Sequence, residues 1–287
     1  MKPSKFRYHR VRSQDELLQL LADNAGDARI LAGGQSLIPM MNLRVAAPAL
    51  LLDINDLQEL GQITVEPEVV RIGALVRYRQ LEASSVVKSE LPLIAAALPH
   101  VAHLAIRNRG TLGGSLALAD PAAEMPACIL ALDATLVVAS IRGRRRIAAA
   151  DFFRGPYETA LGPDEMLEAV EIPRRPDALY FFDEVARRHG DYAIAGLAGI
   201  APRPRQETGS LRLVYFGVSD RPHLARSALG LLAAGPVSDD RLAAAEAAVI
   251  EGLGTVNDGD GQGALRRHLA RVLFRRAVRR LTEQSWS

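Results

Sequence analysis

The amino-acid sequence predicts an α+β protein built from three consecutive parts. Roughly the first 55 residues show a strand, helix and strand pattern, and short strand pairs with intervening helices follow. The last third combines strand-length apolar runs with alanine-rich helical segments, which is typical of an antiparallel sheet covered by helices. Because 287 residues exceed one small core, we expect a division into residues 1–57, 58–175 and 176–287.

The first part is predicted to be a small β-α-β unit. Ser13 and Glu16 have the spacing of a capping box at the start of a helix. Apolar runs at residues 28–31 and 49–54 have the length of strands. A double glycine follows the first of these runs, and a second helix is expected to begin near Ser36.

The second part is predicted to contain paired strands and several helices. His100 and His103 lie three residues apart on one predicted helix and could share a metal ion. No third ligand lies nearby in the sequence, so a structural role is favoured. The expected strands are residues 62–65, 69–72, 135–141, 144–148 and 166–172, and the expected helices are residues 77–83, 91–105 and 121–132.

The third part begins after a proline- and arginine-containing linker at residues 174–176. Its last helix, residues 264–282, carries seven arginines around an apolar side. We expect this helix to be solvated or to dock a partner rather than a membrane, because bulky interfacial aromatics are lacking. The other expected elements are strands at residues 180–185, 194–200 and 211–218 and helices at residues 225–234 and 239–253.

Composition excludes several functions. A net charge of +2 and an aromatic content of 5% provide little for nucleic-acid binding, so no nucleic-acid partner is expected. Cys128 is the only cysteine, which rules out an internal disulfide and any iron–sulfur or zinc site that needs several thiolates. No secretory signal or membrane-spanning stretch is visible, so a cytoplasmic location is expected. The arginines of residues 142–146 either guard an edge strand or form an anion site, and the edge strand is favoured.

Two glycine-rich stretches are the candidate binding elements. Residues 31–37 contain Gly33 and Gly34, and residues 107–115 contain three glycines. Glycine lets a ligand approach the backbone closely, and successive N–H groups at turns and helix starts form anion-binding concavities. Both stretches therefore favour a phosphate or diphosphate ligand, although each taken singly is also compatible with an ordinary tight turn.

With their flanks, both stretches resemble a known family. The first continues through residues 39–44 to Leu52-Asp53-Ile54, and residues 119–124 (Ala-Asp-Pro-Ala-Ala-Glu) follow the second. Over nearly the whole chain the sequence is similar to the FAD-binding medium subunits of molybdenum hydroxylases, which include carbon monoxide dehydrogenase and the xanthine dehydrogenase group. The resemblance implies an FAD-binding fold of two subdomains, of the PCMH or vanillyl-alcohol-oxidase type, followed by a C-terminal antiparallel sheet with helices.

The resemblance also implies a cofactor and partners. FAD would collect electrons that an iron–sulfur small subunit passes on from a molybdopterin large subunit, and would deliver them to an external acceptor. The three chains would form a heterotrimer. The single cysteine agrees with this division, because the chain cannot hold the clusters itself.

By resemblance, the two stretches clamp the diphosphate and ribityl chain of FAD. Small residues suit this task, because neutral backbone donors and hydroxyls can hold phosphates without charged side chains. The hydroxyls of Ser36, Thr111 and Ser115 are expected to donate hydrogen bonds. The full set of expected FAD-binding residues is Ala32, Gly33, Gly34, Gln35, Ser36, Leu37, Thr111, Gly113, Gly114, Ser115, Glu124, Leu167 and Tyr192.

Three of these positions lie outside the glycine stretches. Glu124 would accept a hydrogen bond from a cofactor hydroxyl, or would only complement a helix dipole. Leu167 would contact the cofactor through its main chain, and Tyr192 would cover the flavin ring or else pack in the core. The chain departs from the family at Glu184, where many relatives carry a lysine, and at Leu118, where they often carry a histidine; these changes put the redox tuning in doubt.

The sequence assigns no catalytic acid–base pair, nucleophile or metal site. It lacks the GxGxxG fingerprint and the Walker loop, which argues against a Rossmann dehydrogenase or a phosphate-hydrolysing enzyme. The alternatives are a stand-alone FAD-dependent oxidase or reductase of similar fold, and a non-catalytic assembly subunit. We further expect Gly33→Val or Gly114→Val to abolish FAD retention by placing a branched side chain against the diphosphate.

Overall fold

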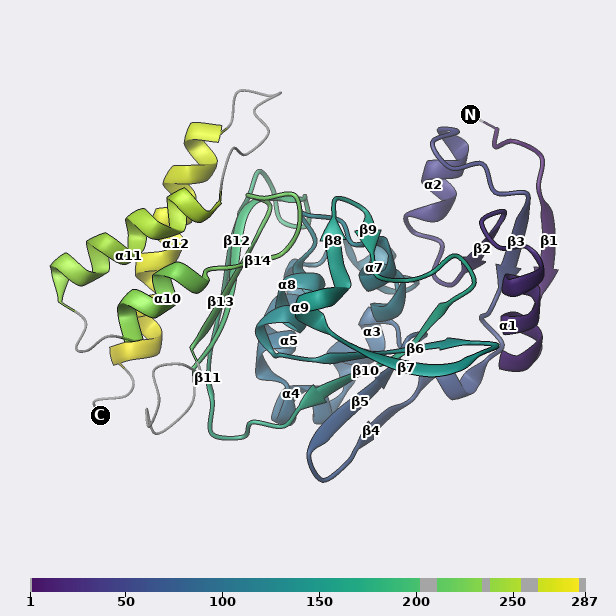
Figure 1. Ribbon diagram of the computed structural model, residues 1–287, viewed down its shortest axis with the longest axis horizontal. Coiled ribbons are helices and arrows are strands. Elements are labelled where there is room, and N and C mark those ends of the chain that lie inside the picture. The colour runs from purple at the N-terminus through teal and green to yellow at the C-terminus, as the bar shows by residue number, and fades with distance from the viewer. Residues whose placement is uncertain (1, 202–210, 234–237, 254–262, 284–287) are drawn as a thin grey trace.

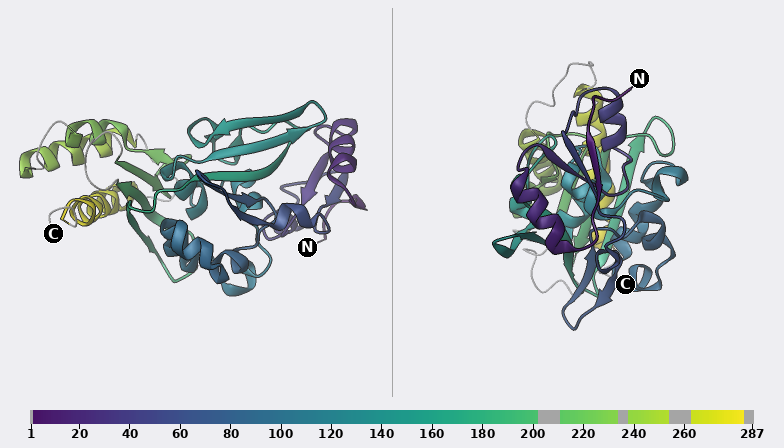
Figure 2. Two further views of the ribbon diagram at one scale, coloured as in Figure 1. Left: turned by 90° about the horizontal axis from the view of Figure 1, so that it is seen from below. Right: turned by 90° about the vertical axis from the view of Figure 1, so that its right-hand side faces the viewer.

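The computed structural model describes residues 2–201, 211–233, 238–253 and 263–283. Three larger sheets follow one another along an elongated molecule, and a fourth sheet has two short strands; the N-terminal unit lies at one end and the last helices at the other (Figures 1 and 2). This arrangement confirms the predicted α+β class. Among the described residues, no helix is long and apolar enough to cross a membrane.

The N-terminal unit contains a parallel three-stranded sheet in the order β1-β3-β2. The predicted β-α-β pattern is present, and the Ser13 hydroxyl caps the first helix by accepting from the Glu16 N–H at 3.2 Å. The additional strand β1 was not predicted, because all four of its side chains are exposed and show no apolar alternation. The elements are β1 (Arg7–Arg10), α1 (Gln14–Asp23), β2 (Ala28–Leu31), α2 (Leu37–Asn42) and β3 (Leu50–Asp53).

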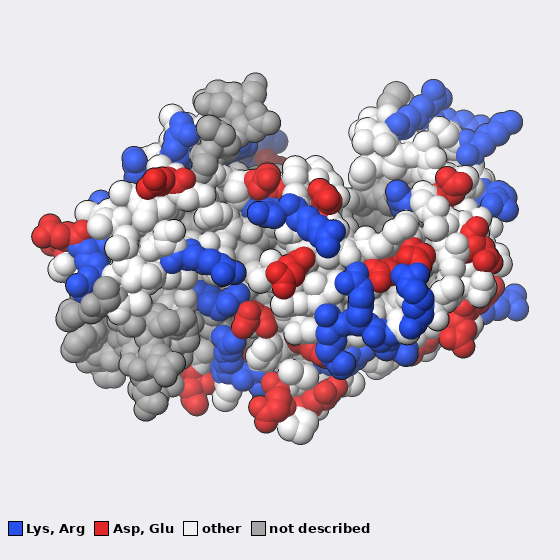
Figure 3. Space-filling model, in the orientation of Figure 1, with Lys and Arg blue, Asp and Glu red and all other residues white. Residues whose placement is uncertain are grey.

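The middle of the molecule is an antiparallel sheet in the order β4-β5-β10-β6-β7. Apolar side chains on one face pack against the helices of this part, while the opposite face carries arginines and glutamates (Figure 3). The short segment η1 (Gln58–Gly61) precedes it, and α9 (Ala149–Phe152), β8 (Phe153–Gly155) and β9 (Glu158–Thr159) border it. The strands are β4 (Ile63–Val65), β5 (Val69–Gly73), β6 (Thr135–Ser140), β7 (Gly143–Ala148) and β10 (Met166–Pro173).

The helices of the middle part correct two expectations. Residues 91–105 do not form one helix, since prolines begin two of its pieces and Ala102 has a φ of 45° between the last two. The glycine pair of residues 113–114 lies in the first turn of a helix rather than in an ordinary tight turn. The helices are α3 (Tyr78–Ala83), α4 (Ser85–Glu90), α5 (Pro92–Ala97), η2 (Leu98–His100), α6 (Leu104–Arg107), α7 (Leu112–Leu118) and α8 (Glu124–Ala131).

The C-terminal sheet has the order β11-β12-β13-β14, and three helices cover its outer face (Figure 1). Its inner face packs on α5 and α8 of the middle part. Alternation along β11 therefore places Phe182 and Glu184 on the inner face and Phe181 and Asp183 on the outer one. The elements are β11 (Leu179–Ala186), β12 (Ala193–Ala201), β13 (Arg212–Phe216), β14 (His223–Leu224), α10 (Arg226–Ala233), α11 (Asp239–Gly252) and α12 (Gly263–Glu283).

Candidate functional site

A cleft of about 790 Å³ lies between the N-terminal unit and the middle of the molecule. Figure 3 shows the surface hollowed between these two parts, with mostly uncharged walls. A cleft of this size is within the range of ligand sites in proteins. Both glycine-rich stretches line it, and so does every residue predicted to bind the cofactor, from Ala32 to Tyr192. The structure thus brings those predicted residues together along one cleft.

The first glycine loop, residues 33–36, connects β2 to α2. Three of its four carbonyl groups are occupied: Gly33 O accepts from the Gln35 side chain at 3.0 Å, Gly34 O from the Ile38 N–H at 3.2 Å, and Ser36 O from the Met40 N–H at 3.1 Å. The preceding carbonyl of Ala32 accepts from the Asn55 side chain at 3.0 Å. Among the described residues, no acceptor binds the backbone N–H of any of the four loop residues. The loop therefore offers the cleft a run of free donors, as an anion requires.

Glycine is required at positions 33 and 34 of this loop for two different structural reasons. A Cβ on Gly33 would lie 2.3 Å from the carbonyl oxygen of Arg109, so the two glycine-rich stretches touch here through their backbones. Gly34 has a φ of +73°, a conformation that glycine adopts without strain. The expectation that a Cβ on Gly33 would point at the diphosphate is therefore wrong: it would push the two stretches apart.

The second stretch uses its backbone donors internally. The N–H groups of Leu112 and Gly113 donate to carbonyls of Val76 and Ala74, each at 3.0 Å. The Gly114 N–H donates to the Thr111 hydroxyl at 3.1 Å, and the Ser115 N–H donates to the Thr111 carbonyl. All four donors of this helix start are thus occupied. The prediction that main-chain donors of this second stretch hold the diphosphate is therefore wrong for residues 112–115, and the prediction for the first stretch stays a prediction.

The two hydroxyl side chains of the second stretch, Thr111 and Ser115, each make a hydrogen bond within the protein. Thr111 is buried and caps α7 with its oxygen, which leaves its hydroxyl hydrogen able to donate elsewhere. Ser115 is hydrogen-bonded to the hydroxyl of buried Tyr78, whose pKa is raised mainly by burial. Ser36 differs from both, because its exposed side chain makes no capping bond at the start of α2.

Glu124 opens helix α8 and lines the cleft although only 8% of its surface is exposed. Burial, followed by the nearby charge of Asp120, raises the pKa of Glu124 to about 7. Its position at a helix start agrees with dipole complementarity, and its place in the cleft wall agrees with a contact to the cofactor. The geometry agrees with both interpretations, and the contact of Glu124 with a cofactor stays a prediction.

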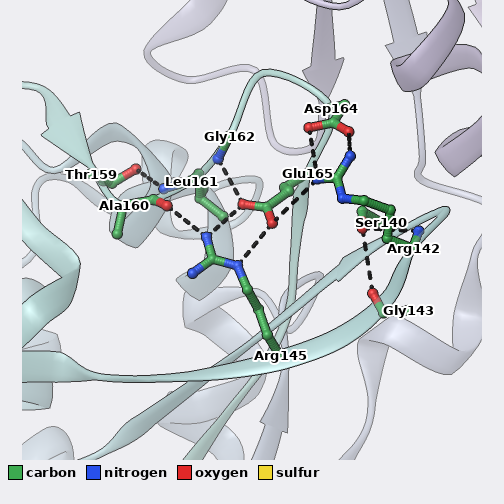
Figure 4. A network of polar contacts seen from close by, with 10 residues as sticks. All are labelled: Ser140, Arg142, Gly143, Arg145, Thr159, Ala160, Leu161, Gly162, Asp164 and Glu165. Carbon is green, nitrogen blue, oxygen red and sulfur yellow. Dashed lines mark hydrogen bonds and ion pairs between the residues drawn. The ribbon is translucent and has the colours of Figure 1, made fainter.

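A network of ion pairs fixes the wall segment that carries Leu167. Arg145 on β7 holds the Glu165 carboxylate through two bonds of 2.8 and 2.7 Å, and Glu165 also accepts from the Gly162 N–H (Figure 4). Arg142 pairs with Asp164 beside it. Glu165, Met166 and Leu167 then line the cleft. The network ties this wall to the hairpin formed by β6 and β7.

The contacts of the same hairpin distinguish between the two predicted roles of the arginines at residues 142–146, a charged edge strand and an anion site. Arg144 pairs with Glu168 at 2.6 Å and Arg146 with Glu171 at 3.0 Å, in addition to the pairs just described. Strand β7 lies at the edge of its sheet. The predicted charged edge strand is therefore present, and the alternative of an anion site at this run is not supported, since each arginine faces a carboxylate.

Two tyrosines stand at the rim of the cleft. Tyr192 is 72% exposed, so it does not pack in the core, and the alternative of a core tyrosine is wrong. Tyr157 is 58% exposed and its hydroxyl donates to Asp120 at 3.3 Å. Exposed aromatic rings beside a cleft are suited to cover a planar ligand.

The two departures from the family occupy different places. Leu118 lines the cleft, whereas the side chain of Glu184 is only 4% exposed and lies outside the cleft wall. The Glu184 replacement therefore changes the interior behind the site rather than the cleft surface. His100 and His103 belong to no metal group, as no cluster of three metal-binding side chains occurs among the described residues.

Sequence reasoning missed two residues of the site. Asn55 holds the Ala32 carbonyl and also donates to Asp53 at 2.7 Å, which anchors the first loop to β3. An asparagine directly after a strand was the only signal for it. Tyr157 was missed as well, because its place beside Asp120 depends on a contact between residues 37 positions apart.

Comparisons with known proteins agree with this geometry. Residues 4–175 match the model of the FAD binding domain in molybdopterin dehydrogenase, and residues 180–281 match the CO dehydrogenase flavoprotein C-terminal domain. The chain is 38% identical to the 6-hydroxypseudooxynicotine dehydrogenase complex subunit alpha of Paenarthrobacter nicotinovorans, covering 97% of this chain and 95% of that one.

Solved structures are similar over the same length. A carbon monoxide dehydrogenase from Hydrogenophaga pseudoflava, in a form lacking the Mo-pyranopterin moiety, superposes with a TM-score of 0.93 at 33% identity, covering 98% of both chains. Quinoline 2-oxidoreductase from Pseudomonas putida 86 gives a TM-score of 0.91 at 37% identity, covering 100% of both chains.

Proposed function

The chain belongs to the family of FAD-binding subunits of molybdopterin dehydrogenases, and from that membership we propose how its cleft serves the complex. It carries FAD and is the electron-transfer flavoprotein subunit of a molybdenum-containing hydroxylase or dehydrogenase. FAD supplies a group that takes up electrons singly and passes them on in pairs. The protein supplies its binding, its orientation and its electrostatic surroundings.

The observation that carries the proposed site is the run of free donors at residues 33–36. The four N–H groups hold the diphosphate, because their residues line the cleft and the groups lack another acceptor among the described residues. The residues fit such a group: three of the four loop carbonyls have other partners, and Gly34 has the backbone freedom that the turn needs. Ser36 adds a hydroxyl donor that no capping bond occupies.

The remaining contacts are proposed for the other walls. The hydroxyls of Thr111 and Ser115 donate along the ribityl chain, and Glu124 accepts from a cofactor hydroxyl. Leu167 contributes main-chain contacts from the wall that Arg145 fixes. Tyr192 covers the exposed face of the ring and excludes water from it.

Partners, location and domain division are also part of the proposal. Two further chains complete the complex: an iron–sulfur small subunit, because the single Cys128 is buried and cannot bind clusters, and a molybdopterin large subunit, which the family membership implies. We place this heterotrimer in the cytoplasm and divide the chain at residues 1–57, 58–175 and 176–287. The relatives are named for carbon monoxide, quinoline and a nicotine derivative, so the substrate is selected by the large subunit.

Native purification through a tag on this chain tests the proposal. We expect about one FAD per chain, released by denaturation and identified by chromatography, together with iron and molybdenum on two co-purifying chains. A yellow protein without partners, whose flavin a small substrate reduces directly, would instead support a stand-alone oxidase or reductase. A colourless protein that still binds the two partners would support an assembly subunit.

A further inference from the structure

Strained backbone positions gather around the cleft. Among the described residues, five residues other than glycine have a φ between 45° and 60°, in the left-handed region. Ala102 and Tyr157 line the cleft, and Arg44 and Ala119 each directly adjoin a residue that lines it; only Asp133 lies elsewhere. A side chain in this conformation costs free energy, and such residues cluster at ligand sites. Each of the four is therefore a candidate for a role in the cleft.

Tyr157 is the one aromatic residue of the five. It is the second residue of the two-residue turn between β8 and β9, directly after Pro156. A turn with proline first and a positive φ second normally carries glycine or asparagine in the second place, because a Cβ is crowded there. The turn alone would favour a smaller residue, so the tyrosine has a reason outside the turn.

Two hydrogen bonds tie Tyr157 to the end of α7. Its N–H donates to the carbonyl of Ala119 at 3.2 Å, and Ala119 is the left-handed C-cap of that helix. Its hydroxyl donates to Oδ2 of Asp120 at 3.3 Å. Burial, followed by the charge of Asp120, raises the pKa of Tyr157, so the phenol stays protonated and donates at neutral pH. The backbone and the side chain of Tyr157 are thus held by two consecutive residues.

Asp120 is itself a fixed point in the cleft wall. Only 8% of it is exposed, and its Oδ1 accepts from the Ala122 N–H at 2.9 Å. The carbonyl of the next residue, Pro121, accepts from the Gly217 N–H at 2.9 Å. Among the described residues, the Tyr157 hydroxyl is the only hydrogen-bond donor to Oδ2. A buried carboxylate oxygen needs a donor, so Asp120 draws the phenol toward the wall.

The ring of Tyr157 is nevertheless open to a ligand. The residue lines the cleft and is 58% exposed, although its hydroxyl end is bonded to the wall. Within the described part of the chain, no other aromatic ring packs against it. An exposed aromatic face beside a cleft can stack on a planar ring of a ligand.

We propose that Tyr157 is a further cofactor-binding residue, whose ring covers a planar ring of the dinucleotide in the cleft, and that Asp120 and the left-handed turn hold it there. This inference rests on the proposed function, since the cleft is the one assigned to FAD. Asp120 acts through Tyr157 and is a positioning residue. FAD contains two planar rings, isoalloxazine and adenine, and both present the same kind of flat aromatic face.

Release of FAD from the natively purified, FAD-bound protein tests this cover. Tyr157→Ala removes the ring and should speed release about 10-fold, the value of one aromatic contact. Tyr157→Phe keeps the ring and loses only a long hydrogen bond, so its release rate should stay within about 3-fold of the wild type. Release from Tyr157→Ala at the wild-type rate would overturn the proposal.

Tyr8→Ala is the matched control for this experiment. Tyr8 is 53% exposed and its hydroxyl donates to an aspartate, Asp53, at 2.6 Å, as that of Tyr157 does to Asp120. Tyr8 is not among the described residues that line the cleft. Release from Tyr8→Ala should therefore match the wild type, and equal acceleration in Tyr8→Ala and Tyr157→Ala would contradict a specific cover.

The visible spectrum of the bound FAD shows which ring is covered. If Tyr157 covers the isoalloxazine, Tyr157→Ala should shift the visible absorption band and raise the fluorescence of the bound flavin. If it covers the adenine, release should be faster while the visible spectrum stays the same. Either result supports the cover, whereas an unchanged spectrum together with unchanged release contradicts it.

Comparison of Tyr157→Gly with Tyr157→Ala separates the strain from the cover. Both remove the ring and the hydroxyl, so both should release FAD equally fast. Glycine adopts a φ of 58° without strain and alanine does not, so flavin-free Tyr157→Gly should unfold roughly 2 °C above Tyr157→Ala. At an unstrained position the order reverses, because glycine loses more chain entropy on folding. Tyr157→Ala as stable as Tyr157→Gly would contradict the strained turn.

A double variant tests whether Asp120 acts through Tyr157. Asp120→Asn and Tyr157→Phe each alter the same hydrogen bond, so the double variant should release FAD no faster than the faster single variant. Fold-changes that multiply would contradict the positioning role of Asp120. A natively purified wild type without FAD would contradict the proposed function itself, whereas a protein that keeps FAD equally well with and without the Tyr157 ring would contradict this inference alone.

Discussion

The two glycine-rich stretches look alike in sequence but are used differently in the structure. Both combine a glycine pair with small polar residues, and both line the same cleft. At residues 33–36 three of the four carbonyls are occupied and the N–H groups have no acceptor among the described residues, whereas the N–H groups of residues 112–115 all donate within the protein. A glycine pair therefore indicates close approach, but only the neighbouring carbonyls decide whether the ligand or the protein uses the donors.

The largest expected effect comes from Gly33→Val, which breaks the contact between the two stretches. Its Cβ would lie 2.3 Å from the backbone oxygen of Arg109, and a backbone atom cannot move away cheaply. We expect a loss of about 3 kcal/mol in the free energy of unfolding, together with loss of FAD. Chemical denaturation and the flavin absorbance of the purified protein measure both. Gly61→Ala, where a Cβ meets nothing within 4 Å, is the matched control.

Gly34→Ala should have an intermediate effect. The φ of +73° is strained for alanine, but the nearest atoms to its Cβ are side-chain atoms, Cδ1 of Leu31 at 3.2 Å and Cγ1 of Ile38 at 3.3 Å. We expect a destabilisation of about 1 to 2 kcal/mol, with weakened FAD binding because the loop donors shift. Thermal unfolding and a flavin titration check this. A variant more stable than the wild type would contradict the left-handed conformation assigned to Gly34.

Thr111→Val should lower stability more than it lowers FAD affinity. The substitution keeps the shape of the buried side chain but removes the acceptor of the Gly114 N–H. Loss of a helix cap costs about 1 kcal/mol. Thr111→Ser retains the cap and should restore stability in denaturation experiments. If both variants are as stable as the wild type, the second stretch does not use its donors internally.

Ser36→Ala should give the smallest change in stability. Unlike Thr111→Val, it should lower FAD affinity more than it lowers stability. Its exposed hydroxyl makes no capping bond, so we expect the free energy of unfolding to change by less than about 0.5 kcal/mol. FAD affinity should fall by roughly 5-fold, the value of one hydrogen bond of about 1 kcal/mol. Fluorescence titration of the flavin-free chain with FAD measures this. A stability loss equal to that of Thr111→Val would remove the distinction between the two stretches.

The fold and the residues that line the cleft could be predicted from the sequence and the family resemblance. The hydrogen-bond partners of the individual backbone N–H groups could not. The capping box at Ser13, the parallel unit around β2 and β3 and the charged edge strand follow from local patterns, and all are present. The occupied donors of residues 112 and 113 depend on carbonyls of Ala74 and Val76, nearly 40 positions away. No local pattern contains such contacts.

The same limit applies to the buried acid. The sequence shows Glu184 only as a departure from the family, and its contact with His100 joins residues 84 positions apart. Strand β1 was missed for a related reason, because its pairing with β3 leaves no periodicity in its exposed side chains. Features set by local periodicity were predictable, whereas those set by long-range contacts required the structure.

Hydrogen exchange of the flavin-free chain, measured with and without FAD, tests most directly whether the first loop alone supplies free main-chain donors. We predict that FAD strongly slows exchange of the amides of residues 33–36, which lack acceptors, and changes little at residues 112–115, which are bonded already. Slowing confined to residues 112–115, with residues 33–36 unaffected, would contradict the account.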